Sequence, residues 1–176
     1  MVAFSLTEEQ LAFAEMARDF AAGEIRPIAP EHDREATMPQ DVITAAHGLG
    51  LMNTHVPERF GGLGLGYLDE ALIAEELGWA CAGIGTSLIV NGLASTPLML
   101  AGSDELQAHY LGRLVDEPRL ASFCRTEPDA GSDAAGMRTT AVRDNGGYVL
   151  NGSKCFITNG GYADWYSVFA KTDRSA

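Results

Sequence analysis

The chain has 176 residues, 46% of them hydrophobic, which is enough for one domain or for one domain and part of a second. Its 24 Asp and Glu against 12 Lys and Arg give a net charge of -12, which argues against nucleic acid binding because that affinity depends on neutralised phosphates. Three cysteines without a CxxC pair and four histidines without ligand spacing predict neither a disulfide framework nor a metal site. With no signal-like N-terminus and no run of about 18 apolar residues, we expect a soluble cytoplasmic chain without a membrane span.

The first two-thirds of the chain predicts helices. Apolar residues recur at helical spacing from Leu11 to Ile25, and Ser5 and Glu8 form the S-x-x-E pattern of a capping box. Pro27 and Pro30 are expected to perturb or end this helix. Further helices are predicted at about 39–47, 68–77, 81–100 and 103–114.

The segment 61–66 holds four glycines in six residues and is predicted to be a loop. A dinucleotide-binding G-x-G-x-x-G would need a glycine where Tyr67 stands and would follow a strand, and no G-x-x-x-x-G-K-[ST] sequence occurs. We therefore interpret the glycines as allowing two segments to pack closely.

Beyond about residue 116 the pattern changes to strands and turns. Strand-like runs occupy 119–125, 137–143, 148–150, 155–158 and 165–172, with turns predicted at 144–147 and 159–161. Helices first and strands second favour two domains over alternating βαβ units. Because so few strands cannot close a sheet, residue 176 is expected to fall inside a domain.

The segment 126–133 follows a predicted strand and is dense in hydroxyls, carboxylates and turn-forming residues. Such a loop can offer donors to a planar, acceptor-rich ligand. From the residues alone, a Pro/Gly surface turn is the preferred interpretation, and a ligand-binding loop remains the alternative.

Two long motifs change that balance. Residues 123–133, Phe-Cys-Arg-Thr-Glu-Pro-Asp-Ala-Gly-Ser-Asp, resemble the flavin-binding signature of the acyl-CoA dehydrogenases, and residues 150–161, Leu-Asn-Gly-Ser-Lys-Cys-Phe-Ile-Thr-Asn-Gly-Gly, resemble that family's second flavin-contact segment. Their separation is typical of the family, and the stretches 57–66 and 77–102 also match. The resemblance covers nearly the whole chain and is closest to the medium-chain-like branch.

The resemblance implies an α+β fold in two parts. Residues 1–118 would form the all-α N-terminal domain, and 119–176 would form an incomplete middle domain with the first strands of an antiparallel β-barrel-like sheet. The family's C-terminal helical bundle would be absent from this chain.

The resemblance also implies an FAD site and an acyl-CoA site. Thr126 and Thr158 would hydrogen-bond the polar edge of the flavin ring, Phe156 would pack on the ring, and Ser132 would contact the thioester ligand. Gly85 and Ile89, four residues apart on one helix face, would lie near the floor of the acyl pocket. The full set of implied cofactor contacts is Phe123, Arg125, Thr126, Gly131, Ser132, Phe156, Ile157 and Thr158, of which Arg125 departs from an apolar residue usual in the family.

The implied reaction is α,β-dehydrogenation of an acyl-CoA to a trans-2-enoyl-CoA with hydride transfer to FAD, as in fatty acid β-oxidation. The glutamate base is expected beyond residue 176, and Glu127 is not a candidate for it. The full-length relatives imply a homotetramer that passes electrons to an electron-transfer flavoprotein.

Two other interpretations remain open. One is an inactive truncated remnant, which downstream sequence without a positioned glutamate would indicate. The other is an acyl-CoA oxidase or a flavin monooxygenase of the same superfamily, which oxygen reactivity of the reduced flavin would indicate. The fragment alone is expected to be inactive and to bind FAD poorly.

Overall fold

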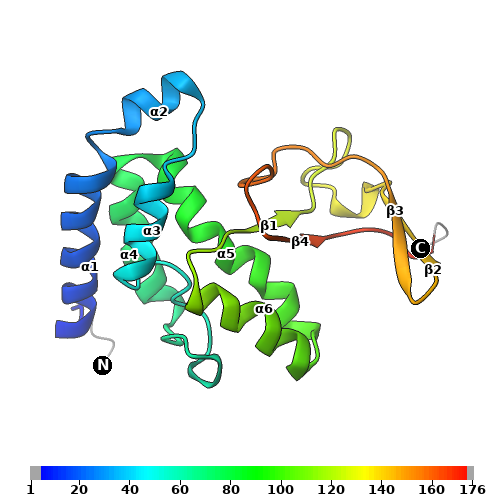
Figure 1. Cartoon of the computed structure of the whole chain (residues 1–176), viewed down its shortest axis with the longest axis horizontal. Coiled ribbons are helices and arrows are strands. Elements are labelled where there is room, and N and C mark those ends of the chain that lie inside the picture. The colour runs from blue at the N-terminus through cyan, green and yellow to red at the C-terminus, as the bar shows by residue number, and fades with distance from the viewer. Residues whose placement is uncertain (1–4, 174–176) are drawn as a thin grey trace.

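The computed structural model describes residues 5–173 and places a helical half beside a smaller half made of strands and loops (Figure 1). The predicted order, helices first and strands second, is confirmed. The helices are α1 (Glu8–Phe20), continued by a π-helical turn (Ala21–Ile25), α2 (Ala29–Glu35), α3 (Gln40–Gly48), α4 (Tyr67–Ala80), α5 (Ala82–Ala101) and α6 (Asp104–Asp116), with short 3-10 turns at Glu58–Phe60 and Ala134–Gly136.

The start of α1 differs from the prediction. Thr7, not Ser5, is the N-cap, and its Oγ1 accepts a hydrogen bond from the Gln10 amide while Gln10 Oε1 accepts one from the Thr7 amide. This is a capping box two residues further along the chain, so the prediction of Ser5 with Glu8 was wrong. Both patterns suit a helix start, and the local sequence does not choose between them.

The helix α2 was not predicted, because Pro27 and Pro30 were interpreted only as helix breakers. Pro30 lies in the first turn of α2, where its missing N–H costs nothing and its fixed φ favours the helix. The helix ends at Ala36, whose backbone adopts the left-handed conformation with φ 52°.

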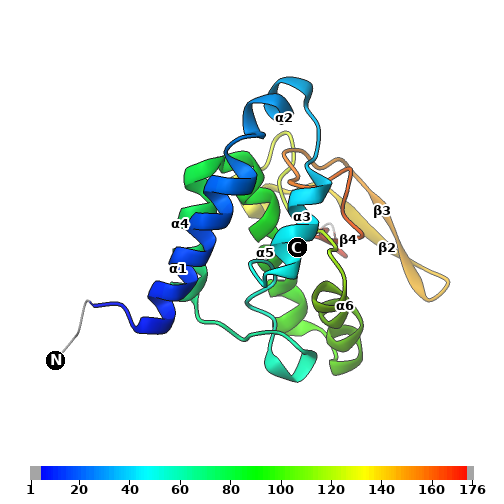
Figure 2. The ribbon, with the colours of Figure 1, turned by 60° about the vertical axis from the view of Figure 1, so that its left-hand side comes forward.

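The main core lies between α1, α3, α4 and α5. Figure 2 shows α1 in front of α4, with α5 behind them. Gly85 of α5 lets these helices approach, since a Cβ there would lie 2.9 Å from the Gly78 nitrogen of α4. The largest fully buried apolar side chains of this core are Ile25, Ile43, Leu51, Ile73, Leu77 and Leu88.

The helix α5 is long and apolar. Among residues 5–173, it is the one helix whose length and apolar composition would suffice to cross a membrane. In this structure α5 packs against α4 and β1 and buries Leu88, Asn91 and Ala94 completely. A central core helix of this kind passes the same test of length and hydropathy.

The loop 61–66 is confirmed as a loop, and its glycines have the predicted role. Gly61 and Gly64 have φ values of 85° and 60°, and a Cβ on Gly62 would collide with the Val56 carbonyl. Gly61 and Gly64 therefore supply backbone turns at positive φ, and Gly62 permits the close packing that was predicted.

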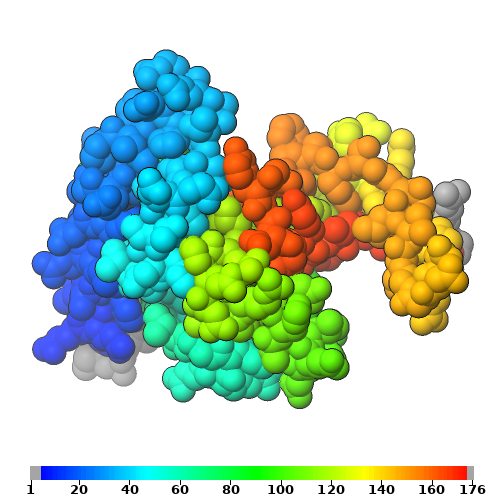
Figure 3. All heavy atoms as spheres, in the orientation of Figure 1, coloured from blue at the N-terminus to red at the C-terminus, as the bar shows by residue number. Residues whose placement is uncertain are grey.

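The strands are β1 (Ala121–Cys124), β2 (Thr140–Asp144), β3 (Gly147–Asn151) and β4 (Trp165–Val168). The strands β2 and β3 form an antiparallel hairpin whose turn, as predicted, uses Asn145 and Gly146 at positive φ. The pair β1 and β4 is parallel, in contrast to the antiparallel arrangement expected throughout. The hairpin stands away from the helical half (Figure 3).

The segment 155–158 is not a strand, so that prediction was wrong. It runs as an irregular loop into the predicted turn that begins at Asn159. Phe156 adopts φ 56°, which lies outside the β region and interrupts any ladder.

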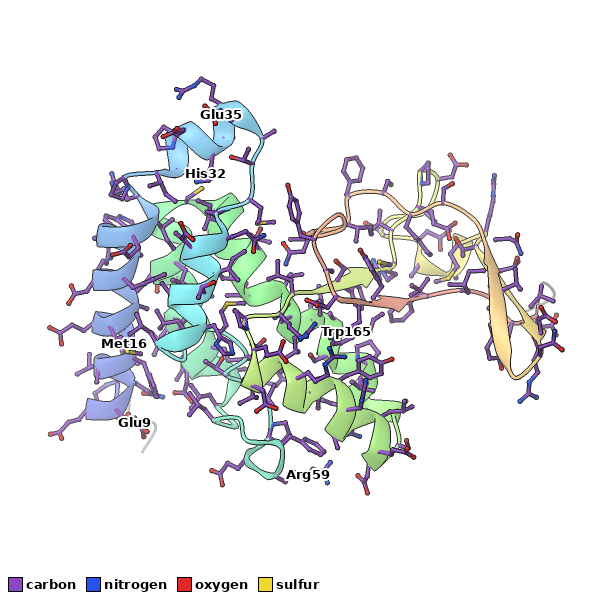
Figure 4. All side chains as sticks on the ribbon, viewed as in Figure 1. Glu9, Met16, His32, Glu35, Arg59 and Trp165 are labelled. Atoms are coloured by element: carbon purple, nitrogen blue, oxygen red, sulfur yellow. The ribbon has the colours of Figure 1, made fainter. Side chains whose placement is uncertain are left out.

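Buried polar contacts join the two halves. Asn91 of α5 donates to Asn53 Oδ1 (2.8 Å) and to the Arg119 carbonyl (2.9 Å), and its own oxygen accepts from the Ala121 amide of β1 (2.7 Å). Where β4 meets α6, the Trp165 ring lies 5.4 Å from that of Tyr110 (Figure 4). The base of the strand half is thereby fixed on α5 and α6.

Candidate functional site

The two flavin-like motifs lie side by side along β1. The Cys155 amide donates to the Thr126 carbonyl (3.0 Å), and the Ser122 hydroxyl of β1 donates to the Thr158 carbonyl (2.8 Å). Asn159 Nδ2 donates to the Ser87 carbonyl of α5 (2.9 Å) and anchors the end of the second motif on the helical half. Segments about thirty residues apart thus form one continuous surface.

The buried carboxylate of Glu127 is the centre of this arrangement. Its Oε1 accepts from Lys154 Nζ (2.8 Å) and from the Thr139 amide (2.9 Å), and its Oε2 accepts from the Arg138 amide (2.6 Å). Lys154 also donates to the Arg125 carbonyl (3.0 Å). We refer to this arrangement of Glu127, Lys154 and the amides of Arg138 and Thr139 as the carboxylate clamp.

The clamp has a clear electrostatic consequence. The hydrogen bond from Lys154, followed by those from Thr139 and from the Arg138 amide, lowers the pKa of Glu127 far below its ordinary value. The carboxylate is therefore ionised and fully engaged as an acceptor, so it is not available to take a proton from a substrate.

Phe156 is the most unusual residue of the surface. Its side chain is 93% exposed although it is a large aromatic group, and its backbone has φ 56°. An exposed aromatic residue in a sparsely populated backbone region, held between anchored neighbours, is typical of a binding surface. Ile157 beside it is half-buried.

Thr126 and Thr158 are both partly buried. Within residues 5–173, the structure gives neither hydroxyl a protein hydrogen-bond partner, although their carbonyls are engaged. Two hydroxyl donors beside an exposed aromatic ring suit a planar ligand with a polar edge. The residues present therefore fit the flavin ring that the resemblance implies.

The other predicted cofactor contacts have mixed surroundings. Phe123 of β1 is half-buried and packs edge-on against Phe169, with ring centroids 5.0 Å apart. Arg125 folds back and donates to the Gly131 carbonyl (3.0 Å), which closes the loop on itself. Gly131 and Ser132 are exposed at its outer edge.

The predicted acyl-pocket pair is separated in the structure. Ile89 is 41% exposed and lines a groove of about 580 Å³ between α4 and α5, whereas Gly85 is buried against α4 and does not line it. Sequence reasoning missed the polar part of this groove, where His55 Nδ1 lies 3.5 Å from Glu70 Oε1. The two residues belong to different elements and no motif in the sequence connects them.

In the described part of the chain, residues 5–173, no group of three or more His, Cys, Asp or Glu side chains is arranged to hold a metal ion.

Comparison with known proteins identifies the family. Residues 7–118 match the family model of the acyl-CoA dehydrogenase N-terminal domain, and residues 122–176 match that of the acyl-CoA dehydrogenase middle domain. The chain belongs to the acyl-CoA dehydrogenase family, and its fold is that of the first half of such proteins.

Individual relatives agree with this assignment. A probable medium-chain specific mitochondrial acyl-CoA dehydrogenase of Caenorhabditis briggsae is 40% identical over 98% of this chain and 42% of its own length. The butyryl-CoA dehydrogenase structure from Megasphaera elsdenii has a TM-score of 0.89 at 37% identity, over 99% of this chain and 47% of that one. A glutaryl-CoA dehydrogenase from Mycobacterium smegmatis in complex with FADH2 has a TM-score of 0.86 at 30% identity, over 96% and 44%. The chain spans less than half the length of each.

Proposed function

We propose that this chain carries the flavin-facing half of an FAD-dependent acyl-CoA dehydrogenase that oxidises an acyl-CoA thioester to the trans-2-enoyl-CoA. The observation that carries the proposal is the exposed ring of Phe156 on a segment hydrogen-bonded to that of Thr126, together with the hydroxyls of Thr126 and Thr158, to which the described residues offer no hydrogen-bond partner. The relatives support it, because they include acyl-CoA dehydrogenases and one of them contains FADH2.

FAD, when bound, supplies the acceptor for the β-hydride. In the proposal Thr126 and Thr158 donate hydrogen bonds to the polar edge of the ring and Phe156 covers it against water. Ser132, at the exposed edge of the loop, contacts the thioester ligand. Phe123, Arg125, Gly131 and Ile157 shape the backbone around these groups and make the remaining contacts.

Removal of the α-proton needs a carboxylate base, and the carboxylate clamp argues against Glu127. That group is committed to Lys154 and to two amides, and its pKa is far below the range useful for a general base at neutral pH. Glu127 is therefore not the base, and the resemblance supports a glutamate beyond residue 176 in that role.

The groove between α4 and α5 suggests the substrate, and the resemblance suggests the partners. Ile89, on the groove between α4 and α5, suits an apolar acyl chain of medium or greater length, and Gly85 contributes by letting α5 approach α4. The resemblance supports an electron-transfer flavoprotein as the electron acceptor, a homotetrameric full-length protein and a role in β-oxidation. It also supports the division into residues 1–118 and 119–176, of which 1–4 and 174–176 lie outside the described residues.

The alternatives remain an inactive remnant and an oxidase or monooxygenase of the same superfamily. Oxygen consumption by the reduced flavin would favour an oxidase or monooxygenase.

The test is a flavin titration of the 176-residue chain, followed by visible absorbance and flavin fluorescence, with Phe156→Ala and Tyr148→Ala as matched variants. Tyr148 is also an exposed aromatic residue, but it lies on the β2–β3 hairpin. We expect weak binding that Phe156→Ala abolishes and Tyr148→Ala leaves unchanged. No binding, or equal binding by all three proteins, would overturn the proposal.

Octanoyl-CoA is then added to the flavin-loaded chain under anaerobic conditions. We expect no bleaching of the flavin, because the base lies outside this chain. Bleaching would show that a residue of this chain removes the proton.

A further inference from the structure

The carboxylate clamp joins three separate segments: the loop after β1, the two residues just before β2 and the segment after β3. Its members are nearly inaccessible, since the side chains of Glu127 and Lys154 are 6% and 11% exposed. Gly152, just before Lys154, is required for the close approach, because a Cβ there would collide with Thr139. The packing is therefore built around this ion pair.

We propose that Lys154 and Glu127 are positioning residues, whose ion pair fixes the two cofactor-facing segments in the relative placement that the flavin site needs. This inference rests on the proposed function for its ligand. In this proposal neither the Lys154 nor the Glu127 side chain touches the cofactor, and both act through the backbone of neighbouring residues.

The argument follows from adjacency along the chain. Glu127 directly follows Thr126, and Lys154 lies two residues before Phe156, so the ion pair connects the two residues predicted to meet the ring from different sides. Lys154 also bonds the Arg125 carbonyl, while the Cys155 amide bonds the Thr126 carbonyl. These contacts involve three consecutive residues of the loop after β1, 125–127, and fix the position of the segment 154–155 along that loop.

The backbone of Phe156 gives a second reason. A non-glycine residue at φ 56° persists only where the surrounding structure determines it. On its N-terminal side that constraint comes from Cys155 and Lys154, and on its C-terminal side from the Ser122 and Asn159 contacts. Release of the clamp leaves the N-terminal side of the exposed ring held by the Cys155 amide alone.

A nearby ion pair provides the control. Arg138 Nη1 lies 3.2 Å from Asp129 Oδ2, but these side chains are 80% and 71% exposed and neither enters the clamp. Arg138 contributes only its main-chain amide to the clamp, and a substitution of the side chain leaves that amide in place. Exposed pairs of this kind contribute little to stability. Arg138→Met and Lys154→Met remove the same charge close to Glu127, yet only Lys154→Met breaks the clamp.

The first test is hydrogen exchange on the 176-residue chain, read at the Cys155 amide, with FAD affinity measured in parallel. Lys154→Met is expected to lower the protection of Cys155 and to weaken FAD binding by about tenfold or more, whereas Arg138→Met changes neither. Lys154→Arg, which keeps a cation, should restore part of both. Unchanged Cys155 protection in Lys154→Met would overturn the positioning role even if no flavin bound to any variant.

The second test uses pH, since a merely space-filling role would not respond to it. In the wild type the pKa of Glu127 in the folded protein lies below that of an ordinary glutamate. The carboxylate therefore keeps its charge and its hydrogen bonds as pH falls through the ordinary range, and it loses them only when pH falls through the lower pKa of the folded state. The other ionisable groups around it are Lys154, Arg138, Asp129, Arg125 and Cys124.

Lys154→Met is expected to raise the pKa of Glu127 toward its usual range. Protection of the Arg138 and Thr139 amides should then be lost as pH falls from about 5 to about 3, while the wild type and Arg138→Met stay constant. The double variant Lys154→Met with Glu127→Gln should show no such titration. If the Arg138 and Thr139 amides of the wild-type protein already lost protection in this pH range, the result would contradict the clamp.

Discussion

At the scale of single residues, buried polar side chains carry the connection between the two halves. Asn91 is fully buried, and its three hydrogen bonds reach Asn53, Arg119 and Ala121. Asn53 in turn donates to the Leu114 carbonyl of α6 (2.7 Å) and has φ 59°. Sequence reasoning gave no role to either residue, because the groups that they bond lie about thirty or more residues away and, apart from their own mutual bond, belong to the backbone.

Asn91→Leu keeps the branching and the number of heavy atoms of the side chain but removes every one of these hydrogen bonds. It leaves the Ala121 amide and the Asn53 oxygen buried without partners, so we expect a loss of about 3 kcal/mol in the free energy of unfolding. Urea denaturation measures it, with exposed Asn151→Leu as the control. A loss below about 0.5 kcal/mol would show that water or relaxation replaces the network.

The N-cap of α1 can be tested by a pair of single substitutions. Thr7→Ala removes the acceptor for the Gln10 amide and should cost about 1 kcal/mol of stability. Ser5→Ala, at the position predicted from the sequence, should be neutral. Thermal unfolding of the two variants decides between the assignments, and a larger effect at Ser5 would reverse the correction made above.

At the scale of elements, the sequence predicts what depends on local chemistry. Helices 81–100 and 103–114 match α5 and α6 within about two residues, and the Asn145–Gly146 turn is correct because positive φ needs those residue types. The parallel pairing of β1 with β4 and the irregular segment 155–158 were not predictable, because long-range hydrogen bonds decide them. The two flavin-like motifs were found from their residues, but the clamp between them needed the fold.

The α4 and α5 packing offers a second matched pair. Gly85→Ala would place a methyl group 2.9 Å from the Gly78 nitrogen and 3.0 Å from the Leu77 carbonyl carbon, so separation of the helices should cost about 1–3 kcal/mol. Gly83→Ala on the same helix meets nothing nearer than Cys81 Sγ at 3.9 Å and should stabilise by up to about 1 kcal/mol. Chemical denaturation compares them, and equal effects would contradict the close helix contact.

At the scale of the whole molecule, stability is expected to be uneven. The helical half buries a continuous core, whereas every residue of β3 is exposed and β2 buries only Thr140. The base of the hairpin is fixed by reciprocal bonds, in which Ala141 donates to the Lys171 carbonyl and the Lys171 amide donates to the Thr139 carbonyl. An isolated two-stranded hairpin is marginal in water, so its far end depends on little besides its own turn.

Hydrogen exchange across the chain should therefore show two levels of protection. The amides of β2 after Val142 and the amides of β3 are expected to exchange by local opening, with a free energy of opening near zero. The amides in the middle of α4 and α5 are expected to exchange only when the whole chain unfolds. The amides of Ala141 and Lys171, held by the reciprocal bonds, should lie between these levels. Hairpin protection equal to that of α5 would mean that the exposed face of β3 is covered in solution, and its loss on dilution would identify a second copy of the chain as the cover.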